Sequence, residues 1–168
     1  CQLNDEDIPT TVSLTADSQD QPVFHMPVEV PPRPEVKQNF VVCVSVSYWR
    51  HNPHQLVEWM ELLKRMGVGL VTIYNNSLSE EAGKVFQYYD TTGFVDFRQS
   101  HNFVAVEGEH TLHMHMSPVI NDCMYRNMYS FKKVIVTDLD ELIVPRDYTT
   151  YAELLVYLDK LYPGEHPA

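Results

Sequence analysis

Short runs of β-branched and aromatic residues alternate with helical patterns from residue 39 onward, and this alternation limits the fold more than any other feature. The first run is apolar at nearly every position, which is typical of a strand buried on both faces of a sheet. Strands that alternate with helices form mostly parallel sheets, because each helix returns the chain to the edge where the next strand begins. The sequence therefore predicts an α/β fold with helices on both faces of the sheet. The predicted strands span 40–46, 70–74, 94–98 and 134–137.

Four segments are predicted to be helices, and the first has apolar residues at the spacing that is typical of helices. In the first segment, apolar residues recur at intervals of three and four, and Trp59 and Met60 are expected to pack the helix against the sheet. Gly67 is expected to end this helix. The predicted helices span 55–66, 79–90, 118–128 and 151–161.

The segments between these elements are predicted to be loops. Polar residues and a proline indicate a loop over 48–54, and two asparagines with a serine indicate a turn over 75–77. Pro118 is expected to open the third helix, because proline is tolerated in the first turn of a helix but not in its interior. The histidine-rich segment 99–117 has no predicted element. Its H-x-x-H-x-H pattern, formed by His110, His113 and His115, could suggest a zinc site, but the spacing matches neither one helix face nor a usual zinc motif, so a loop is favoured.

Residues 1–38 differ from the rest of the chain in composition. They contain six of the eleven prolines and no glycine, and their seven acidic residues are accompanied by only two basic ones, Arg33 and Lys37. Proline-rich segments favour extended geometry, and the apolar spacing here follows neither the helical nor the strand period. We therefore predict an extended acidic stem over 1–38, followed by one globular domain over 39–168. An arm that lies on a neighbouring surface is the alternative.

Composition excludes several classes of protein. The 168 residues carry a formal net charge of −11, so the basic surface that nucleic-acid binding requires is missing. No apolar run approaches the roughly 20 residues that a membrane-spanning helix requires. Three cysteines are too few for a disulfide-rich scaffold. Cys43 and Cys123 are predicted to be free thiols in the core, with a disulfide between them as the less favoured alternative.

The end of the last predicted strand carries the strongest chemical signal. Ligands of open parallel sheets bind at the carboxyl ends of the strands. Here Asp138, Asp140 and Glu141 follow a buried strand directly, and carboxylates so close together repel each other unless a cation or protons neutralise them. In extended geometry Asp138 and Asp140 point to the same side, which suits Mg²⁺ or Mn²⁺. The alternative is an acidic turn whose side chains lie in water.

Five sequence blocks, taken in order, resemble the domain of glycosyltransferase family 92 over residues 40–161. The blocks are FVVCVSV, LVEWMELLKRMGV, LVTIYNNSLSEEAGKVFQYYDTTGFV, NDCMYRN and KVIVTDLDELIVP. The resemblance implies a GT-A fold, which is a Rossmann-like nucleotide-binding sheet. It also implies a D-x-D motif that binds Mn²⁺ or Mg²⁺ together with the diphosphate of a UDP-sugar. The implied reaction transfers a hexose, expected to be galactose, from UDP-galactose or another UDP-sugar to a glycan acceptor on a glycoprotein or glycolipid, with inversion.

The same resemblance implies roles for particular residues. Asp138 and Asp140 are expected to bind the metal and the diphosphate, with Glu141 supporting them. No residue is identified as the general base. Asn75 also begins an N-glycosylation sequon, although a glycan there would obstruct the donor site. The other residues expected to contact the donor are Ser45, Ser47 and Tyr48 after the first strand, Asn75 after the second, and Asp122 and Arg126 of the third helix.

The resemblance also bears on location and completeness. Family members look like type II membrane proteins of the Golgi, so residues 1–38 are expected to join a luminal domain to an anchor upstream of Cys1. Few residues follow Asp140, and the chain is therefore expected to be truncated before the acceptor-binding half. A donor-binding module that does not transfer sugar is the alternative function. A phosphohydrolase is a more distant one, because its usual aspartyl nucleophile signature is absent.

Overall fold

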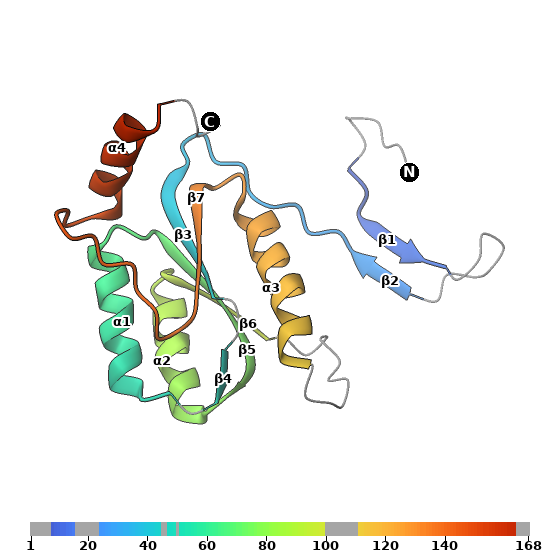
Figure 1. Ribbon diagram of the computed structural model, residues 1–168. Coiled ribbons are helices and arrows are strands. Elements are labelled where there is room, and N and C mark those ends of the chain that lie inside the picture. The colour runs from blue at the N-terminus through green and yellow to red at the C-terminus, as the bar shows by residue number, and fades with distance from the viewer. Residues whose placement is uncertain (1–7, 16–23, 45–46, 50, 100–110, 164–168) are drawn as a thin grey trace. The chain divides into compact units, whose positions relative to one another are not determined.

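The computed structural model describes residues 8–15, 24–44, 47–49, 51–99 and 111–163, with the backbone alone at 47–49 and 111–115. The chain divides into two compact units, Cys1–Pro32 and Arg33–Ala168, and Figure 1 shows the elements of both. None of the described helices combines the length and the apolar character that crossing a bilayer requires.

The first unit contains a β-hairpin. Strand β1 (Thr11–Leu14) pairs antiparallel with β2 (Phe24–Pro27), and Val12 lies opposite Met26. Polar and apolar residues alternate along both strands, but for only four residues in each, which is too short for the pattern to stand out from a stem. The hairpin corrects the local structure expected for this segment, and its role as a stem stays a prediction.

The second unit is built on a parallel sheet in the spatial order β6, β5, β3, β7. A short strand, β4, pairs with β5 beyond the end of β3, so β3 and β4 together form one side of the ladder. Counted along the chain without β4, this order is third, second, first, fourth, which is the order of the first four strands in a Rossmann sheet. The strands are β3 (Gln38–Val44), β4 (Ser47–Trp49), β5 (Leu70–Leu78), β6 (Val95–Gln99) and β7 (Phe131–Thr137).

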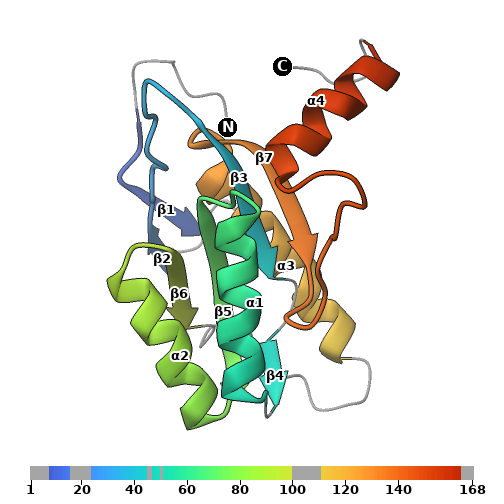
Figure 2. The same cartoon turned by 90° about the vertical axis from the view of Figure 1, so that its left-hand side faces the viewer.

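Helices cover both faces of this sheet. Helices α1 (Pro53–Arg65) and α2 (Glu80–Thr91) lie on one face, and α3 (Thr111–Asn127) lies on the other (Figure 2). The fourth helix, α4 (Tyr151–Leu161), begins near the edge of the sheet at which the strands start. There the amide of Tyr151, its first residue, donates to the carbonyl of Met66. The predicted α/β fold with helices on both faces is therefore confirmed.

Local sequence signals account for the helix boundaries. The side chain of Asn52 accepts a hydrogen bond from the amide of His54 at the start of α1, and Ser79 caps α2 in the same way. Gly67 and Gly93 follow α1 and α2 with φ of 88° and 75°, a backbone conformation that glycine adopts without strain. The chain can therefore turn sharply after each helix and enter the next strand.

The two faces of the sheet have cores of different size. The alternation of side chains along β3 sends Val42 to the face of α1 and α2, and Cys43 to the face of α3. The first face carries a large apolar cluster that includes Leu56, Trp59 and Phe86, whereas the buried cluster that the described side chains form on the second face is small. Its members are Cys43, Tyr74, Val119 and Cys123, with Val134 packed against them.

Three expected boundaries are wrong. Helix α3 begins at Thr111, seven residues earlier than predicted, so Pro118 lies inside it. Strand β5 continues through the turn predicted at 75–77, and β4 occupies part of the loop predicted at 48–54. The last two errors have one cause, because Asn75 pairs with β4 on one side and with β6 on the other. The hydrogen bonds of these two ladders keep residues 75–77 extended, although their residue types favour a turn.

A disulfide joins Cys43 of β3 to Cys123 of α3, which corrects the prediction of free thiols. Their Cα atoms lie 6.0 Å apart, within the usual range for a disulfide, and 80 residues separate them in sequence. Both side chains are fully buried between the sheet and the helix. The sequence places each cysteine on an element but gives no distance between the two elements, which is why it did not favour the bond.

Candidate functional site

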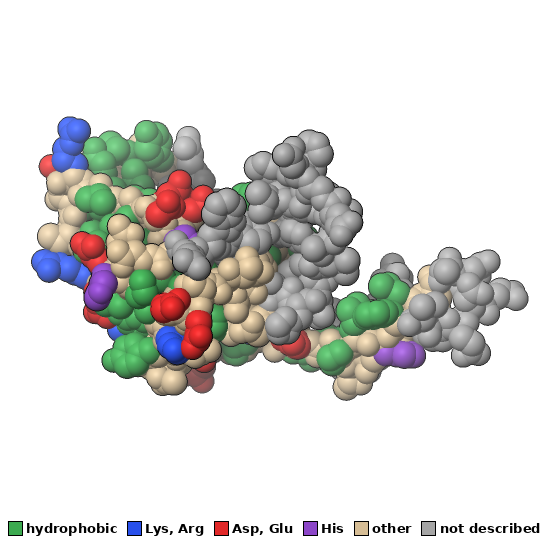
Figure 3. Space-filling view, turned by 90° about the horizontal axis from the view of Figure 1, so that it is seen from below, with side chains coloured by type: hydrophobic (Ala, Val, Ile, Leu, Met, Phe, Trp, Pro, Cys, Tyr) green, Lys and Arg blue, Asp and Glu red, His purple; other side chains and the backbone are tan. Residues whose placement is uncertain are grey.

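The strands of the second unit end at one edge of the sheet, because they are parallel. Thr137, the last residue of β7, lies opposite Val44, the last residue of β3. Figure 3 views the molecule from the side toward which these strands run in Figure 1, and acidic side chains lie on this face among hydrophobic and polar ones. The acidic segment after β7 and the polar end of β5 therefore belong to the same edge.

Residues 138–141 form a tight turn directly after β7, which we call the acidic turn. The amide of Glu141 donates to the carbonyl of Asp138 over 3.2 Å and closes the turn, so the extended geometry expected here is wrong. Leu139 is only 4% exposed and packs into the core, whereas Asp138 and Asp140 are exposed. Burial of the apolar residue thus leaves the carboxylates on either side of it to solvent.

Hydrogen bonds fix the two ends of the acidic turn. The indole nitrogen of Trp59 on α1 donates to the backbone carbonyl of Glu141 over 2.7 Å. The carboxylate of Glu141 turns back toward the strand, where it accepts from the hydroxyl of Thr137 and from the amide of Asp138, each over 3.4 Å. Glu141 therefore holds the turn in shape as well as adding to its charge.

The donor set of the acidic turn fits a hard divalent cation that is shared with a substrate. Among the described residues, no three His, Cys, Asp or Glu side chains gather into a group that could hold a metal ion. Two exposed carboxylates on one turn still offer the oxygen ligands that Mg²⁺ prefers. Mg²⁺ commonly takes one or two carboxylates from the protein and its other ligands from water and substrate phosphates. Asp138 and Asp140 match that arrangement.

The end of β5 contributes two asparagines. The amide nitrogen of Asn75 donates to the side chain of Gln99 over 3.0 Å, and its oxygen accepts from the amide of Leu78 over 3.1 Å. A glycan on Asn75 would interfere with the first of these bonds, so the structure disfavours modification of the sequon. The amide nitrogen of Asn76 is buried and has no acceptor among the described residues. An acceptor on a bound ligand would satisfy it.

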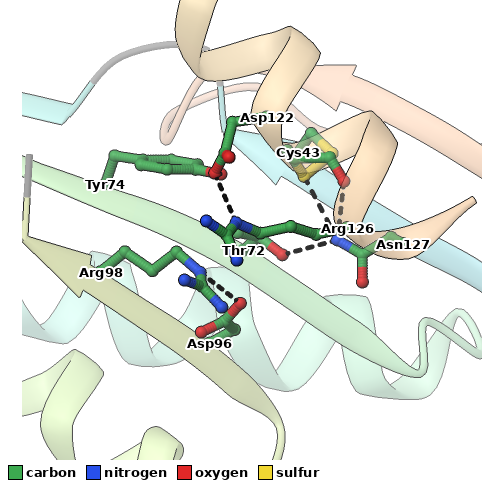
Figure 4. The surroundings of a disulfide bond; sticks show 9 residues. Cys43, Thr72, Tyr74, Asp96, Arg98, Asp122, Arg126 and Asn127 are labelled. Carbon is green, nitrogen blue, oxygen red and sulfur yellow. Dashed lines mark hydrogen bonds and ion pairs between the residues drawn. A yellow bond between two sulfur atoms is a disulfide. The ribbon is translucent and has the colours of Figure 1, made fainter. Parts of the chain in front are cut away.

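A polar cluster links α3 to β5 on the other face of the sheet (Figure 4). The hydroxyl of Tyr74 donates to Asp122 over 2.5 Å, and Arg126 donates to the same carboxylate oxygen over 2.7 Å. Asp122 and Arg126, both predicted to contact the donor, are thus brought together with Tyr74. Their donor contacts stay a prediction.

Protonation of this cluster follows from its partial burial. Burial raises the pKa of the Tyr74 hydroxyl far above its ordinary value, and the hydrogen bond to Asp122 raises it further. Burial also acts to raise the pKa of Asp122, but the hydrogen bonds from Arg126 and Tyr74 and the charges of two arginines outweigh it and lower that pKa. Asp122 is therefore ionised and Tyr74 protonated around neutral pH.

Two further interactions complete the surroundings of the disulfide in Figure 4. Arg98 of β6 donates to Asp96 over 2.8 Å, and its charge also acts on Asp122. The buried side chain of Asn127 donates to the hydroxyl of Thr72 over 3.2 Å and to a backbone carbonyl of α3 over 2.9 Å. Helix α3 is thus fixed to the sheet by directional contacts in its last two turns, between Asp122 and Asn127.

Some predicted site residues lie outside the part of the chain that the structure describes. Ser45 lies outside the described residues, as do the side chains of Ser47 and Tyr48. The backbone of these last two residues forms β4, which pairs with the polar end of β5. Their predicted contacts with a nucleotide therefore stay predictions.

A model of glycosyltransferase family 92 matches residues 38–161, from the start of β3 to the end of α4. The chain belongs to glycosyltransferase family 92. The match covers most of the chain and includes both the acidic turn and the polar cluster, and the observed sheet is consistent with the GT-A fold of the family. Membership places the chain among the glycosyltransferases. A search of curated proteins found no match.

Three residues that shape the site of this family 92 domain were not singled out for it by the sequence. Leu139 lies between the two aspartates, and an apolar residue inside an acidic turn is a signal for burial that could have been read. Trp59 and Tyr74 were visible only as core candidates, because their hydrogen-bond partners are 82 and 48 residues away in sequence.

Proposed function

We propose that the chain binds the UDP-galactose donor for the transfer of galactose to a glycan acceptor with inversion, with Mn²⁺ or Mg²⁺ held by the acidic turn. The observation that carries the proposal is the placement of Asp138 and Asp140, exposed on a turn at the carboxyl edge of a sheet with Rossmann order. That edge is where nucleotides bind in open α/β sheets. The choice of galactose rests on the family resemblance.

The chemistry requires a group that stabilises the departing nucleotide. A divalent ion, when bound, supplies positive charge at the β-phosphate, where negative charge builds up as the bond to the sugar breaks. Asp138 and Asp140 would hold it, and the turn orients them. Glu141 adds negative charge beside them while its hydrogen bonds keep the turn closed.

The polar end of β5 would contact the nucleotide. The buried amide of Asn76 lacks an acceptor among the described residues, and the uracil, ribose and phosphate groups of UDP all carry acceptor oxygens. Asn75 lies next to it and holds the strand end through Gln99 and Leu78. Ser45, Ser47 and Tyr48 complete the proposed nucleotide pocket. We place Asp122 and Arg126 at the donor sugar, as the resemblance implies.

We also propose that the domain works in the lumen of the Golgi, with residues 1–38 as its stem. Disulfides form and persist in oxidising compartments and are rare in the cytosol. The buried bond between Cys43 and Cys123 supports a luminal domain for that reason.

Calorimetric titration of UDP into the chain, with Mn²⁺ and then with EDTA, tests the proposal. We expect binding that requires Mn²⁺ and is lost in Asp140→Ala. Asp147→Ala is the matched control, because it removes the same charge from an exposed position six residues after the turn closes, outside the proposed site. If the affinity for UDP is the same with EDTA as with Mn²⁺, and the same in Asp140→Ala as in the wild type, the chain is instead a donor-binding module without metal-assisted chemistry. No binding by a folded sample would overturn the proposal.

A further inference from the structure

A buried side chain of α1 holds the acidic turn from outside it. Trp59 is 6% exposed, and its indole nitrogen reaches the carbonyl of Glu141 over 2.7 Å across 82 residues of sequence. The other hydrogen bonds described here come from neighbours in sequence: the hydroxyl of Thr137, the last residue of β7, donates to the carboxylate and to the carbonyl of Glu141, and the amide of Asp138 donates to that carboxylate. Among the described hydrogen bonds of the turn, the contact from Trp59 therefore ties its far end to a separate element.

The geometry of this contact suits a support rather than a ligand. The indole N–H is a donor only, and a buried tryptophan needs an acceptor for it. Its ring packs in the apolar cluster of α1 and α2 together with Leu139, the residue between the two aspartates. Trp59 thus supports the turn in two ways. It packs in the same cluster as Leu139 at the centre of the turn, and it donates a hydrogen bond to Glu141 at the end of the turn.

Such support matters because the carboxylates of the turn repel each other. Three acidic residues lie within four positions, and their repulsion favours any conformation that separates them. Bringing two of them to one cation requires a frame that resists this repulsion. Groups that orient metal ligands without touching the metal typically change its affinity by roughly tenfold to a hundredfold when they are removed.

We propose that Trp59 is a positioning residue of the donor site: its N–H fixes the carbonyl of Glu141 and so holds Asp138 and Asp140 in the arrangement that binds the cation. The inference rests on the proposed function, because it assumes a cation at the acidic turn. Trp59 acts through the turn and is itself buried away from solvent.

The test compares two core substitutions on the same face of α1. Trp59→Phe keeps an aromatic ring in the core and removes the N–H. Leu63→Val also perturbs the core one helical turn further on, at a residue that is 2% exposed and has no bond to the turn. The affinity for Mn²⁺ in the presence of UDP is measured for both by electron paramagnetic resonance, together with the thermal midpoint of each.

We expect Mn²⁺ affinity to fall roughly tenfold or more in Trp59→Phe and to stay within about twofold of the wild type in Leu63→Val. A purely structural role for Trp59 would lower the thermal midpoint without changing the affinity for Mn²⁺, and that result would overturn the inference.

Asp140→Ala separates this inference from the proposed function. If it abolishes Mn²⁺ binding while Trp59→Phe does not weaken it, only the role of Trp59 fails. If the wild-type chain binds no Mn²⁺ with UDP, the proposed function fails and the role of Trp59 fails with it.

Discussion

The two faces of the sheet hold their helices by different means. On the face of α1 and α2, a large apolar cluster packs the helices through burial, which is not directional. On the face of α3, a small apolar cluster is supplemented by the disulfide and by hydrogen bonds from Tyr74 and Asn127. The acidic turn is anchored to the first face through Leu139 and Trp59. We therefore expect the proposed metal site to depend on apolar packing, and the attachment of α3 to depend on redox state and charge.

Phe86→Ala should be the most costly change, because Phe86 is fully buried in the cluster of α1 and α2 and its ring lies 5.8 Å from that of Phe97. We expect the free energy of unfolding in urea to fall by about 3 to 5 kcal/mol. A loss below about 1 kcal/mol would show that this face does not rest on packing.

Loss of the disulfide should come next. Replacing both Cys43 and Cys123 by alanine releases a link across 80 residues, and we expect it to cost about 2 to 4 kcal/mol of stability. Reductant should weaken the wild type similarly and have no further effect on the double variant. Cys1→Ser is the control, and its response to reductant should equal that of the wild type. If reduction left the stability of the wild type unchanged, the disulfide would not be what holds α3.

Asp122→Asn should lower the free energy of unfolding by about 1 kcal/mol at neutral pH. We expect less than for a fully buried charged hydrogen bond, because the Asp122 side chain is 35% exposed. The pKa of Asp122 is lowered in the folded chain, so its contribution is complete above the ordinary pKa of an aspartate. It is lost as pH falls through the lowered value. Urea unfolding of wild type and variant at a series of acidic pH values should show the difference shrinking. A constant difference would contradict the role assigned to the ionised form.

Thr72→Val should have the smallest effect, lowering the free energy of unfolding by about 0.5 kcal/mol. The substitution removes the hydroxyl that accepts from Asn127 but keeps the shape of a fully buried side chain. Asn127 retains its bond to the carbonyl of Cys123, so its amide is not left without a partner. Thermal unfolding measures the change. A cost above that of Asp122→Asn would mean that the neutral contact, not the charged one, fixes α3.

The sequence predicted the elements whose patterns are long and local. Val42 and its neighbours in β3 are apolar because both faces of the strand are covered. Tertiary pairing decided the rest. Asn75 is extended because strands flank it on both sides, which its own sequence does not indicate.

The position of the acidic turn in the fold was predictable from the sequence, but its geometry was not. The strand pattern before Asp138 placed the carboxylates at the carboxyl edge of the sheet. The turn itself depends on Leu139 entering the core and on a donor from Trp59, and both are contacts between segments far apart in sequence. The same holds for Tyr74 with Asp122 and for the disulfide, since apolar periodicity describes faces of elements and not distances between them.

Anomalous diffraction at the manganese edge, from crystals grown with MnCl₂ and UDP, tests the central claim most directly. The account predicts one anomalous peak between the acidic turn and the diphosphate, with Asp138 and Asp140 as its protein ligands. A manganese ion bound elsewhere, or UDP bound with no manganese at these two carboxylates, would contradict it.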